Sequence, residues 1–198
     1  MSNMFEHREA WLHGLITAVR PIFAKHGASI PNNIRASCGF PSLRALNGLQ
    51  NQRIGECWAE TASKDGSFEI LVSPTLADPM RVAGVLAHEL IHATVGVEAG
   101  HRGPFKRLAL AIGLAGKMPA TTEGDAFKRV LEPILDDLGP YPHAELDARR
   151  RSSGPRKQGS RLQKAMCSLC NYTVRVTRKW VDDVGLPHCP VHGAMEIN

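Results

Sequence analysis

The 198-residue sequence lacks any apolar run that reaches the roughly 18 residues needed to cross a membrane. Its first 25 residues mix acidic, basic and apolar side chains in an amphipathic pattern, which is not typical of a signal peptide. We therefore expect an intracellular, cytoplasmic protein without a membrane partner.

The length allows one domain with a substantial core and a small second unit, but not two full-sized domains.

Cysteine is scarce, and the chain contains only five. Three of them lie late in the sequence at spacings typical of metal ligands, which fits a reducing compartment better than a disulfide framework. We expect the other two, Cys38 and Cys57, to be small buried hydrophobic side chains.

Positive charge is unevenly distributed along the chain. Residues 1–148 hold 14 Lys and Arg against 16 Asp and Glu, a net charge of −2, whereas the remaining residues hold 10 against 3, a net charge of +7. Residues 149–164 are rich in Arg, Lys, Ser, Gly and Pro, a composition that is typical of a flexible basic linker. We therefore predict a large domain at 1–148, a linker at 149–164 and a small domain at 165–198, and any polyanion should bind the C-terminal part.

The pattern of apolar residues predicts an α+β fold for the large domain. Helical periodicity predicts helices at residues 4–26, between Asp78 and Gly96, from Pro104 to Ile112, and at 124–137. Short apolar stretches predict strands at residues 34–38, 54–61 and 67–73. Asp65-Gly66 is a hairpin signal between the last two strands, so we expect a small antiparallel sheet with helices packed on it.

The second predicted helix carries the motif HELIH at residues 88–92. Residues four apart on a helix share a face, so His88 and His92 can both bind one metal ion, and Glu89 lies beside it. A carboxylate in that position suits a general base that takes a proton from an activated water. Zinc is the expected ion, because two imidazoles and one further ligand leave a tetrahedral position open. The alternative is a helix with two unrelated histidines.

The third ligand must come from outside this helix. His101 is the nearest histidine downstream, and Gly96 and Gly100 allow the chain to turn back toward the metal. Glu98 and Glu123 are alternatives, since carboxylates are also zinc ligands. The group that stabilises negative charge on the substrate carbonyl has three candidates, which are Tyr141, His143 and Arg102.

A second set of metal ligands lies near the C-terminus. Eighteen residues separate two short motifs, Cys167-Ser-Leu-Cys170 and Cys189-Pro-Val-His192. Such paired spacing predicts a zinc ribbon, in which four protein ligands close the coordination sphere and the ion is structural. Asn171 and Gly193 follow the two motifs, where a left-handed backbone conformation is often required.

Together these motifs resemble the SprT-like zinc metallopeptidases. The resemblance covers residues 78–114 and 165–193 and depends on HELIH, on Gly100-His101, on Phe105 and Lys106, and on the ribbon. It implies a zincin-like fold in which the catalytic zinc is bound by His88, His92 and His101, with Glu89 as the catalytic residue. The sequence departs from the family pattern by placing Arg102 before Gly103, by a short loop after His92, and by His192 in place of a fourth cysteine.

The ribbon also offers candidates for contact with nucleic acid. Positive charge and one stacking ring come from Arg175, Arg178, Lys179 and Trp180. A solvated basic tail is the alternative, because charge alone does not identify a ligand.

The sequence as a whole predicts a zinc metalloendopeptidase with one catalytic and one structural Zn²⁺. The hairpin at residues 54–73 is the candidate sheet edge to which a substrate peptide adds as a strand. The family resemblance implies protein substrates that are associated with DNA, to which the ribbon recruits the enzyme. The alternative is a non-catalytic zinc-containing module that binds nucleic acid or regulates, but such a module has no need of Glu89 beside the metal.

Overall fold

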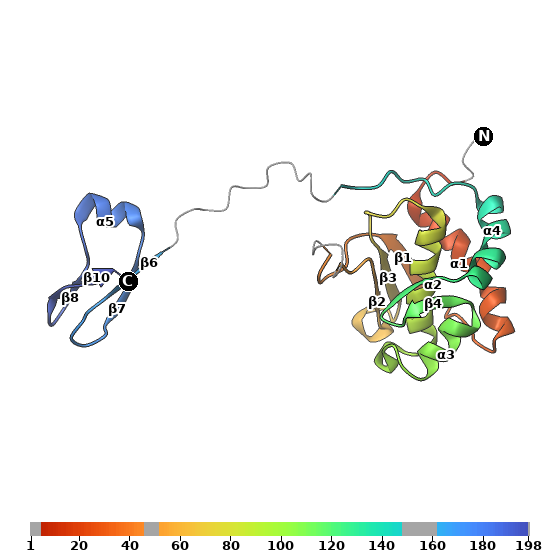
Figure 1. The fold of residues 1–198 in the computed structure, drawn as a ribbon, viewed down its shortest axis with the longest axis horizontal. Helices are drawn as coiled ribbons and strands as arrows, with labels where there is room; N and C mark the ends of the chain where they lie inside the picture. Colours follow the sequence, from red (N-terminus) through yellow and green to blue (C-terminus); the bar gives the residue numbers. More distant parts are fainter. Residues whose placement is uncertain (1–4, 46–51, 148–161, 198) are drawn as a thin grey trace. The chain divides into compact units, whose positions relative to one another are not determined.

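The computed structural model describes residues 5–45, 52–147 and 162–197. These form two compact units, residues 1–149 and 150–198, whose elements are labelled in Figure 1. Most of the predicted linker lies outside the described residues. Both units mix helices and strands, so the predicted α+β class is confirmed.

The sheet of the first unit has three strands in the order β1-β3-β2. The strands are β1 (Ile34–Cys38), β2 (Gly55–Trp58) and β3 (Phe68–Val72). β2 is antiparallel to β3, as predicted, but β1 is parallel to β3, so the prediction of a purely antiparallel sheet was wrong. The reason is the connection after β1: the chain crosses to the far edge to form β2 and then returns between the two strands as β3, in the direction of β1.

One face of this sheet is apolar because side chains alternate along each strand. Phe68, Ile70 and Val72 of β3 are buried, and Ile34 and Ala36 of β1 lie in register beside the first two. The same core contains one face of α1 (Arg8–Lys25), whose buried residues are Trp11, Leu12, Leu15, Ile16, Val19 and Phe23. Gly27, with φ +71°, follows the end of α1, as its glycine predicts.

The helix α2 (Pro79–Val95) runs through the centre of the unit, between the sheet and the elements that follow α2 in the chain (Figure 1). It begins as the sequence predicts, with the Asp78 side chain accepting a hydrogen bond from the Arg81 backbone N–H at 2.7 Å and with Pro79 at the first helical position. It ends at Gly96, whose φ is +90°. Eleven of its 17 residues are buried, which fixes the side chains of the HELIH motif firmly against their neighbours.

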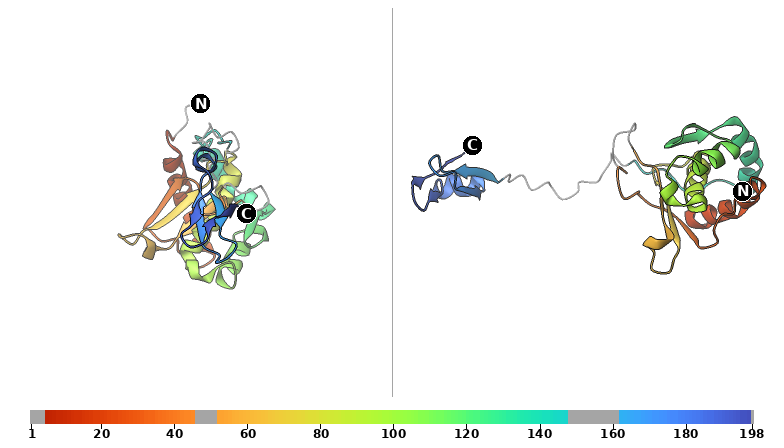
Figure 2. Two further views of the ribbon diagram at one scale, coloured as in Figure 1. Left: turned by 90° about the vertical axis from the view of Figure 1, so that its left-hand side faces the viewer. Right: turned by 90° about the horizontal axis from the view of Figure 1, so that it is seen from below.

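The remaining elements enclose α2 on its other sides (Figure 2). Two predicted helices are present, α3 (Pro104–Ala111) and α4 (Asp125–Leu138). Between them lies an antiparallel hairpin that was not predicted, formed by β4 (Leu114–Lys117) and β5 (Ala120–Glu123). Short 3₁₀ helices span Glu60–Ala62 and Val97–Ala99. None of the helices in the described part of the chain is long and apolar enough to cross a membrane.

The second unit consists of a three-stranded sheet, a separate pair of short strands and one short helix. Its strands are β6 (Gln163–Met166), β7 (Thr173–Val176), β8 (His188–Cys189), β9 (Gly193–Ala194) and β10 (Glu196–Ile197), with sheet order β10-β6-β7 and a separate β8-β9 pair. A short helix, α5 (Arg178–Val184), connects β7 to β8. β6 begins two residues before the predicted start of the ribbon at 165. Among the described residues of this unit, only Ala165, Cys167, Cys189 and Met195 are buried, so apolar packing contributes little to holding it together.

Candidate metal centres and cleft

Three histidine side chains of the first unit converge on one point. His101 Nε2 lies 3.1 Å from His88 Nε2 and 3.2 Å from His92 Nε2. Two nitrogens bound at 2.0–2.1 Å to a tetrahedral ion lie about 3.3 Å apart, so the spacing matches a shared metal ion rather than a chance cluster. The three residues could therefore hold a metal ion through their Nε2 atoms.

His101 reaches this point because the chain reverses after α2. Gly96, Gly100 and Gly103 all adopt positive φ, at +90°, +54° and +46°, which is costly for other residues. The two alternative ligands lie elsewhere. Glu123 forms an ion pair with Arg81 at 2.6 Å, and Glu98 is not part of the histidine cluster.

Phe105 of α3 forms the floor of the histidine cluster. Its ring is fully buried and lies 4.8, 4.5 and 5.0 Å from the ring centroids of His88, His92 and His101. Burial, with repulsion from the neighbouring imidazoles, lowers the pKa of His88 to about 3 and that of His92 to about 4. Both rings are therefore neutral at physiological pH, which is the form that binds metals.

The β4-β5 hairpin supplies a partner for His88. Thr121 Oγ1 lies 2.8 Å from His88 Nδ1, so a hydrogen bond on that side leaves Nε2 directed at the metal position. The hairpin is fixed to α2 by Arg81, which donates to the Thr121 carbonyl at 3.2 Å and to Glu123 at 2.6 Å. Gly84 makes room for this contact, since a Cβ there would overlap the Glu123 carboxylate. Sequence reasoning missed Thr121, because nothing in its local pattern marks it.

Glu89 is buried and lines the same cleft as the histidines. Burial raises its pKa to about 8, with an opposing effect from the charge of Arg53. The carboxylate lies against β2 at Gly55, where a Cβ would overlap Glu89 Oε1 and approach Val85 Cγ1 to 2.7 Å. The Glu89 carboxylate can therefore lie against β2 only because residue 55 is a glycine.

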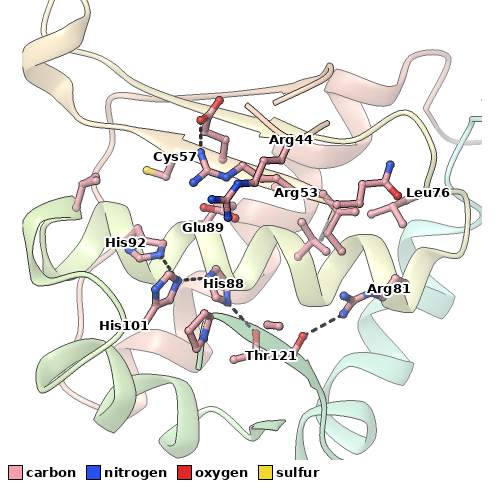
Figure 3. A pocket seen from close by; sticks show the side chains of 18 of the residues that line it. Arg44, Arg53, Cys57, Leu76, Arg81, His88, Glu89, His92, His101 and Thr121 are labelled. Carbon is pink, nitrogen blue, oxygen red and sulfur yellow. Dashed lines mark hydrogen bonds and ion pairs between the residues drawn. The ribbon is translucent and has the colours of Figure 1, made fainter. Parts of the chain in front are cut away.

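The cleft has a volume of about 850 Å³ and is lined by the three histidines, Glu89, residues of β2 and β5, and several arginines. In Figure 3 the side chains of Arg44 and Arg53 lie above Glu89, on the side away from His101. Neither arginine was predicted from the sequence to belong to the site. The candidates Tyr141, His143 and Arg102 do not line it; for example, His143 Nε2 bonds instead to the Pro74 carbonyl at 2.8 Å.

The two edges of the three-stranded sheet differ. At the β1 edge, the backbone N–H groups of Ala36 and Cys38 donate to His13 Nε2 and Glu9 Oε1 of α1, at 3.4 and 3.3 Å. The β2 edge instead borders the cleft. The predicted edge at 54–73 therefore lies next to the histidine cluster, at its β2 strand.

Four potential ligands converge in the second unit. His192 Nδ1 lies 3.6 Å from the Sγ atoms of Cys167 and Cys189, and Cys170 Sγ lies 3.6 Å from Cys189 Sγ. Sulfurs about 2.3 Å from a tetrahedral ion lie about 3.8 Å apart, so this group could also hold a metal ion. Asn171 and Gly193 take positive φ, as predicted for the residues that follow the two motifs.

Backbone N–H groups point at all three sulfurs; Tyr172 is the donor to Cys170, whose pKa is nevertheless raised by burial and by the neighbouring Cys189 and Cys167. Hydrogen bonds from Cys170 and Leu169 lower the pKa of Cys167, which favours the thiolate that metals bind. A hydrogen bond from Val191 does the same for Cys189. The turns are thus shaped for negative charge at the sulfurs.

The four candidates for nucleic-acid contact lie on β7 and α5 of the second unit, and all are exposed. Arg178 pairs with Asp182 at 3.7 Å, one turn further along α5. Lys179 Nζ lies 5.3 Å from the centroid of the Trp180 ring, and Trp180 is 53% exposed. Arg175 and Trp180 therefore present a charge and an aromatic face to solvent.

The chain thus combines a three-histidine group beside a buried carboxylate with a separate Cys₃His group. Function must be inferred from the chemistry of these residues. Comparison of the chain with protein-family models, with curated proteins and with solved structures found no match.

Proposed function

We propose that the chain is a zinc metallopeptidase of the SprT-like type, which hydrolyses peptide bonds in DNA-associated proteins. The observation that carries this proposal is the convergence of three histidine Nε2 atoms next to the buried carboxylate of Glu89, which comes from the same helix as His88 and His92. Three protein ligands leave one tetrahedral position open, which is the arrangement of catalytic zinc sites, whereas structural sites are closed by four.

His88, His92 and His101 would hold the ion, which when bound supplies Lewis-acid polarisation of the scissile carbonyl and activation of an attacking water. Burial favours the protonated form of Glu89, but the charge of a bound ion would favour its carboxylate, which would then accept the proton of that water and pass it to the leaving amine. Its contact with Gly55 keeps the carboxylate beside the histidine cluster. Thr121 orients the ring of His88 through Nδ1.

The substrate binds as an extra strand at the β2 edge. This edge borders the cleft, whereas the β1 edge is occupied by side chains of α1. Main-chain hydrogen bonds to β2 would hold the peptide extended past Glu89 without reading its sequence. This geometry favours endopeptidase activity, because a strand can enter the cleft anywhere along an unfolded chain.

The second unit acts as the recruiting module in this proposal. A structural zinc at its Cys₃His group would hold a fold with few buried apolar residues. Arg175, Arg178, Lys179 and Trp180 would contact DNA phosphates and bases. The same surface would serve the alternative function, a non-catalytic nucleic-acid-binding module, but that function gives the buried Glu89 no role.

The deciding experiment compares the parent chain with Glu89→Gln and His92→Ala, measuring zinc content and cleavage of an unfolded protein such as casein. We expect two zinc ions per parent chain, two in Glu89→Gln without cleavage, and one in His92→Ala. Glu98→Gln is the matched control, because Glu98 is close to His101 in sequence but does not line the cleft. Cleavage by Glu89→Gln at the parent rate would refute the general-base role, and one zinc in both the parent and His92→Ala would remove the catalytic centre.

A further inference from the structure

The Arg53 side chain is fixed in the cleft by a buried carboxylate. Its Nη1 donates to Glu56 Oε1 at 2.6 Å, and the Glu56 side chain is only 9% exposed. Glu56 also accepts hydrogen bonds from the Ser42 N–H and hydroxyl, at 2.8 and 2.7 Å, and from Trp58 Nε1 at 3.1 Å. Burial alone would raise the pKa of Glu56, but these hydrogen bonds lower it, so the carboxylate is ionised and holds the guanidinium in place.

This fixation leaves most of the guanidinium available. An arginine has five N–H donors, and among the described residues the Arg53 guanidinium uses only Nη1. The Arg53 side chain is 45% exposed, and Arg44 lies beside it in the cleft without an ion pair to any described residue. On this wall of the cleft two guanidinium charges face the carboxylate of Glu56, which neutralises only one of them.

The third arginine of the cleft differs, because Arg81 is paired with Glu123 and fixes the β5 strand. Arg53, in contrast, has side-chain N–H donors that no described residue uses, and it lines the cleft together with Glu89 and His101. Arg53 immediately precedes Ile54 and the β2 edge, so a peptide on that edge passes it.

We propose that Arg44 and Arg53 form a subsite that binds a carboxylate of the peptide substrate, beside the β2 edge. This inference rests on the proposed peptidase function. A guanidinium recognises a carboxylate through paired N–H donors, and the unused donors of Arg53 together with Arg44 meet that requirement. The carboxylate belongs either to an acidic side chain or to the C-terminus of the peptide.

Nucleic acid is the less suitable ligand for this pair. Phosphate backbones are bound by several cations at once, whereas Glu56 neutralises half of the charge here and residues 1–148 carry a net −2. A single carboxylate needs no more than one compensating charge. The position inside the cleft also places the pair where a peptide substrate must lie.

The test uses the full chain and a series of peptides that contain a single Glu and no other charged side chain, with the Glu at a different position in each peptide. Each peptide is paired with one that has Gln at the same position. Both are made with a free and with an amidated C-terminus. We expect one Glu position to raise kcat/KM about tenfold over Gln, chiefly through KM. Arg44→Gln should abolish this preference, so that Glu and Gln peptides are cleaved with equal kcat/KM, and Arg53→Gln should do the same. Arg129→Gln, an exposed arginine on α4, is the control. A preference that depends on the free C-terminus would assign the carboxylate to the chain end.

Binding is measured separately on the Glu89→Gln chain by fluorescence anisotropy of the same peptides. If the parent cleaves Glu and Gln peptides equally, the subsite is wrong and the peptidase function stands. If nothing is cleaved, the proposed function fails, and equal binding of both peptides would then overturn the subsite as well. A single-stranded oligonucleotide is added as a competitor. If it displaces the Glu peptide from the Glu89→Gln chain, and if its own binding is lost when Arg44→Gln is added, Arg44 and Arg53 bind phosphate and the inference is contradicted.

Discussion

Thr121 Oγ1 lies 2.8 Å from His88 Nδ1, although the two residues are 33 positions apart in sequence. The hydrogen bond fixes the ring at the nitrogen opposite the one that faces the other histidines. Partners of this kind hold an imidazole in the orientation and tautomer that bind a metal ion.

Thr121→Val should therefore weaken zinc binding in the first unit by about tenfold or more, because it keeps the shape of the side chain but removes the hydroxyl. The zinc dissociation constant is measured by competition with a chromogenic chelator, in a chain whose ribbon carries Cys167→Ser. Thr122→Val, an exposed neighbour on β5, should have no effect. Unchanged zinc affinity in Thr121→Val would show that the hydroxyl does not orient the ligand.

Gly55→Ala should reduce peptide cleavage by at least about tenfold while zinc remains bound. The new methyl group would overlap the Glu89 carboxylate and displace it from its place beside the histidines. It would also approach the buried Val85 Cγ1 to 2.7 Å, so the melting temperature is measured to show that the chain stays folded. Zinc content and kcat are measured together. Gly39→Ala is the matched control, since its nearest neighbour would lie at 3.4 Å. Full activity in Gly55→Ala would mean that the position of Glu89 is not critical.

The ion pair and hydrogen bonds that Glu56 forms with Arg53, Ser42 and Trp58 predict that the stability of the fold depends on pH. The folded-state pKa of Glu56 lies below its ordinary value of 4.5, so the ionised carboxylate stabilises the fold above that pH, and this contribution is lost as the pH falls through the folded-state pKa. The melting temperature of the first unit should therefore fall more steeply below about pH 4.5 in the parent than in Glu56→Gln. Glu132→Gln, an exposed residue on α4, should follow the parent. Identical acid profiles for the parent and Glu56→Gln would contradict the role of the network.

Removal of residues 150–198 should leave a folded first unit that has lost at least about tenfold in DNA affinity at low salt. The core cluster of the first unit contains no described residue of the second, and the removed part carries a net charge of +6 whereas residues 1–149 carry −1. The measurement is a salt series of DNA binding by both chains, together with casein cleavage without DNA, which should change little. Equal DNA affinity of the two chains would place the nucleic-acid site on the first unit.

Local signals in the sequence were sufficient for most of the elements. Asp78 and Pro79 fix the start of α2, and Gly96 fixes its end, because caps act through neighbouring backbone groups. The β4-β5 hairpin was missed, since Leu114–Lys117 and Ala120–Glu123 contain few residues with strong strand preference. The parallel pairing of β1 was also missed, because pairing direction depends on where the chain travels between strands.

The residues of the candidate site also divide into those that a local sequence pattern predicts and those that it does not. His88, Glu89 and His92 share one helix, so their spacing alone predicts that they come together. Thr121 and Arg53 enter the site through tertiary contacts, from strands and loops that do not follow helical spacing, and no local pattern marks either one. Their roles become visible only when β5 and the residues before β2 are placed against α2.

The hydrogen bonds from Ala36 and Cys38 of β1 to the side chains of α1 have a consequence for self-association. Edge-to-edge stacking into long fibrils requires every molecule to offer two open sheet edges, one for each neighbour. In the described part of the chain, the β1 side of the sheet is blocked by Glu9 and His13, and only β2 can accept another strand. Two molecules could pair through β2, but the pair would then be closed. A chain that added a peptide strand at β2, as in the proposed function, would in this way be kept from forming fibrils through this sheet.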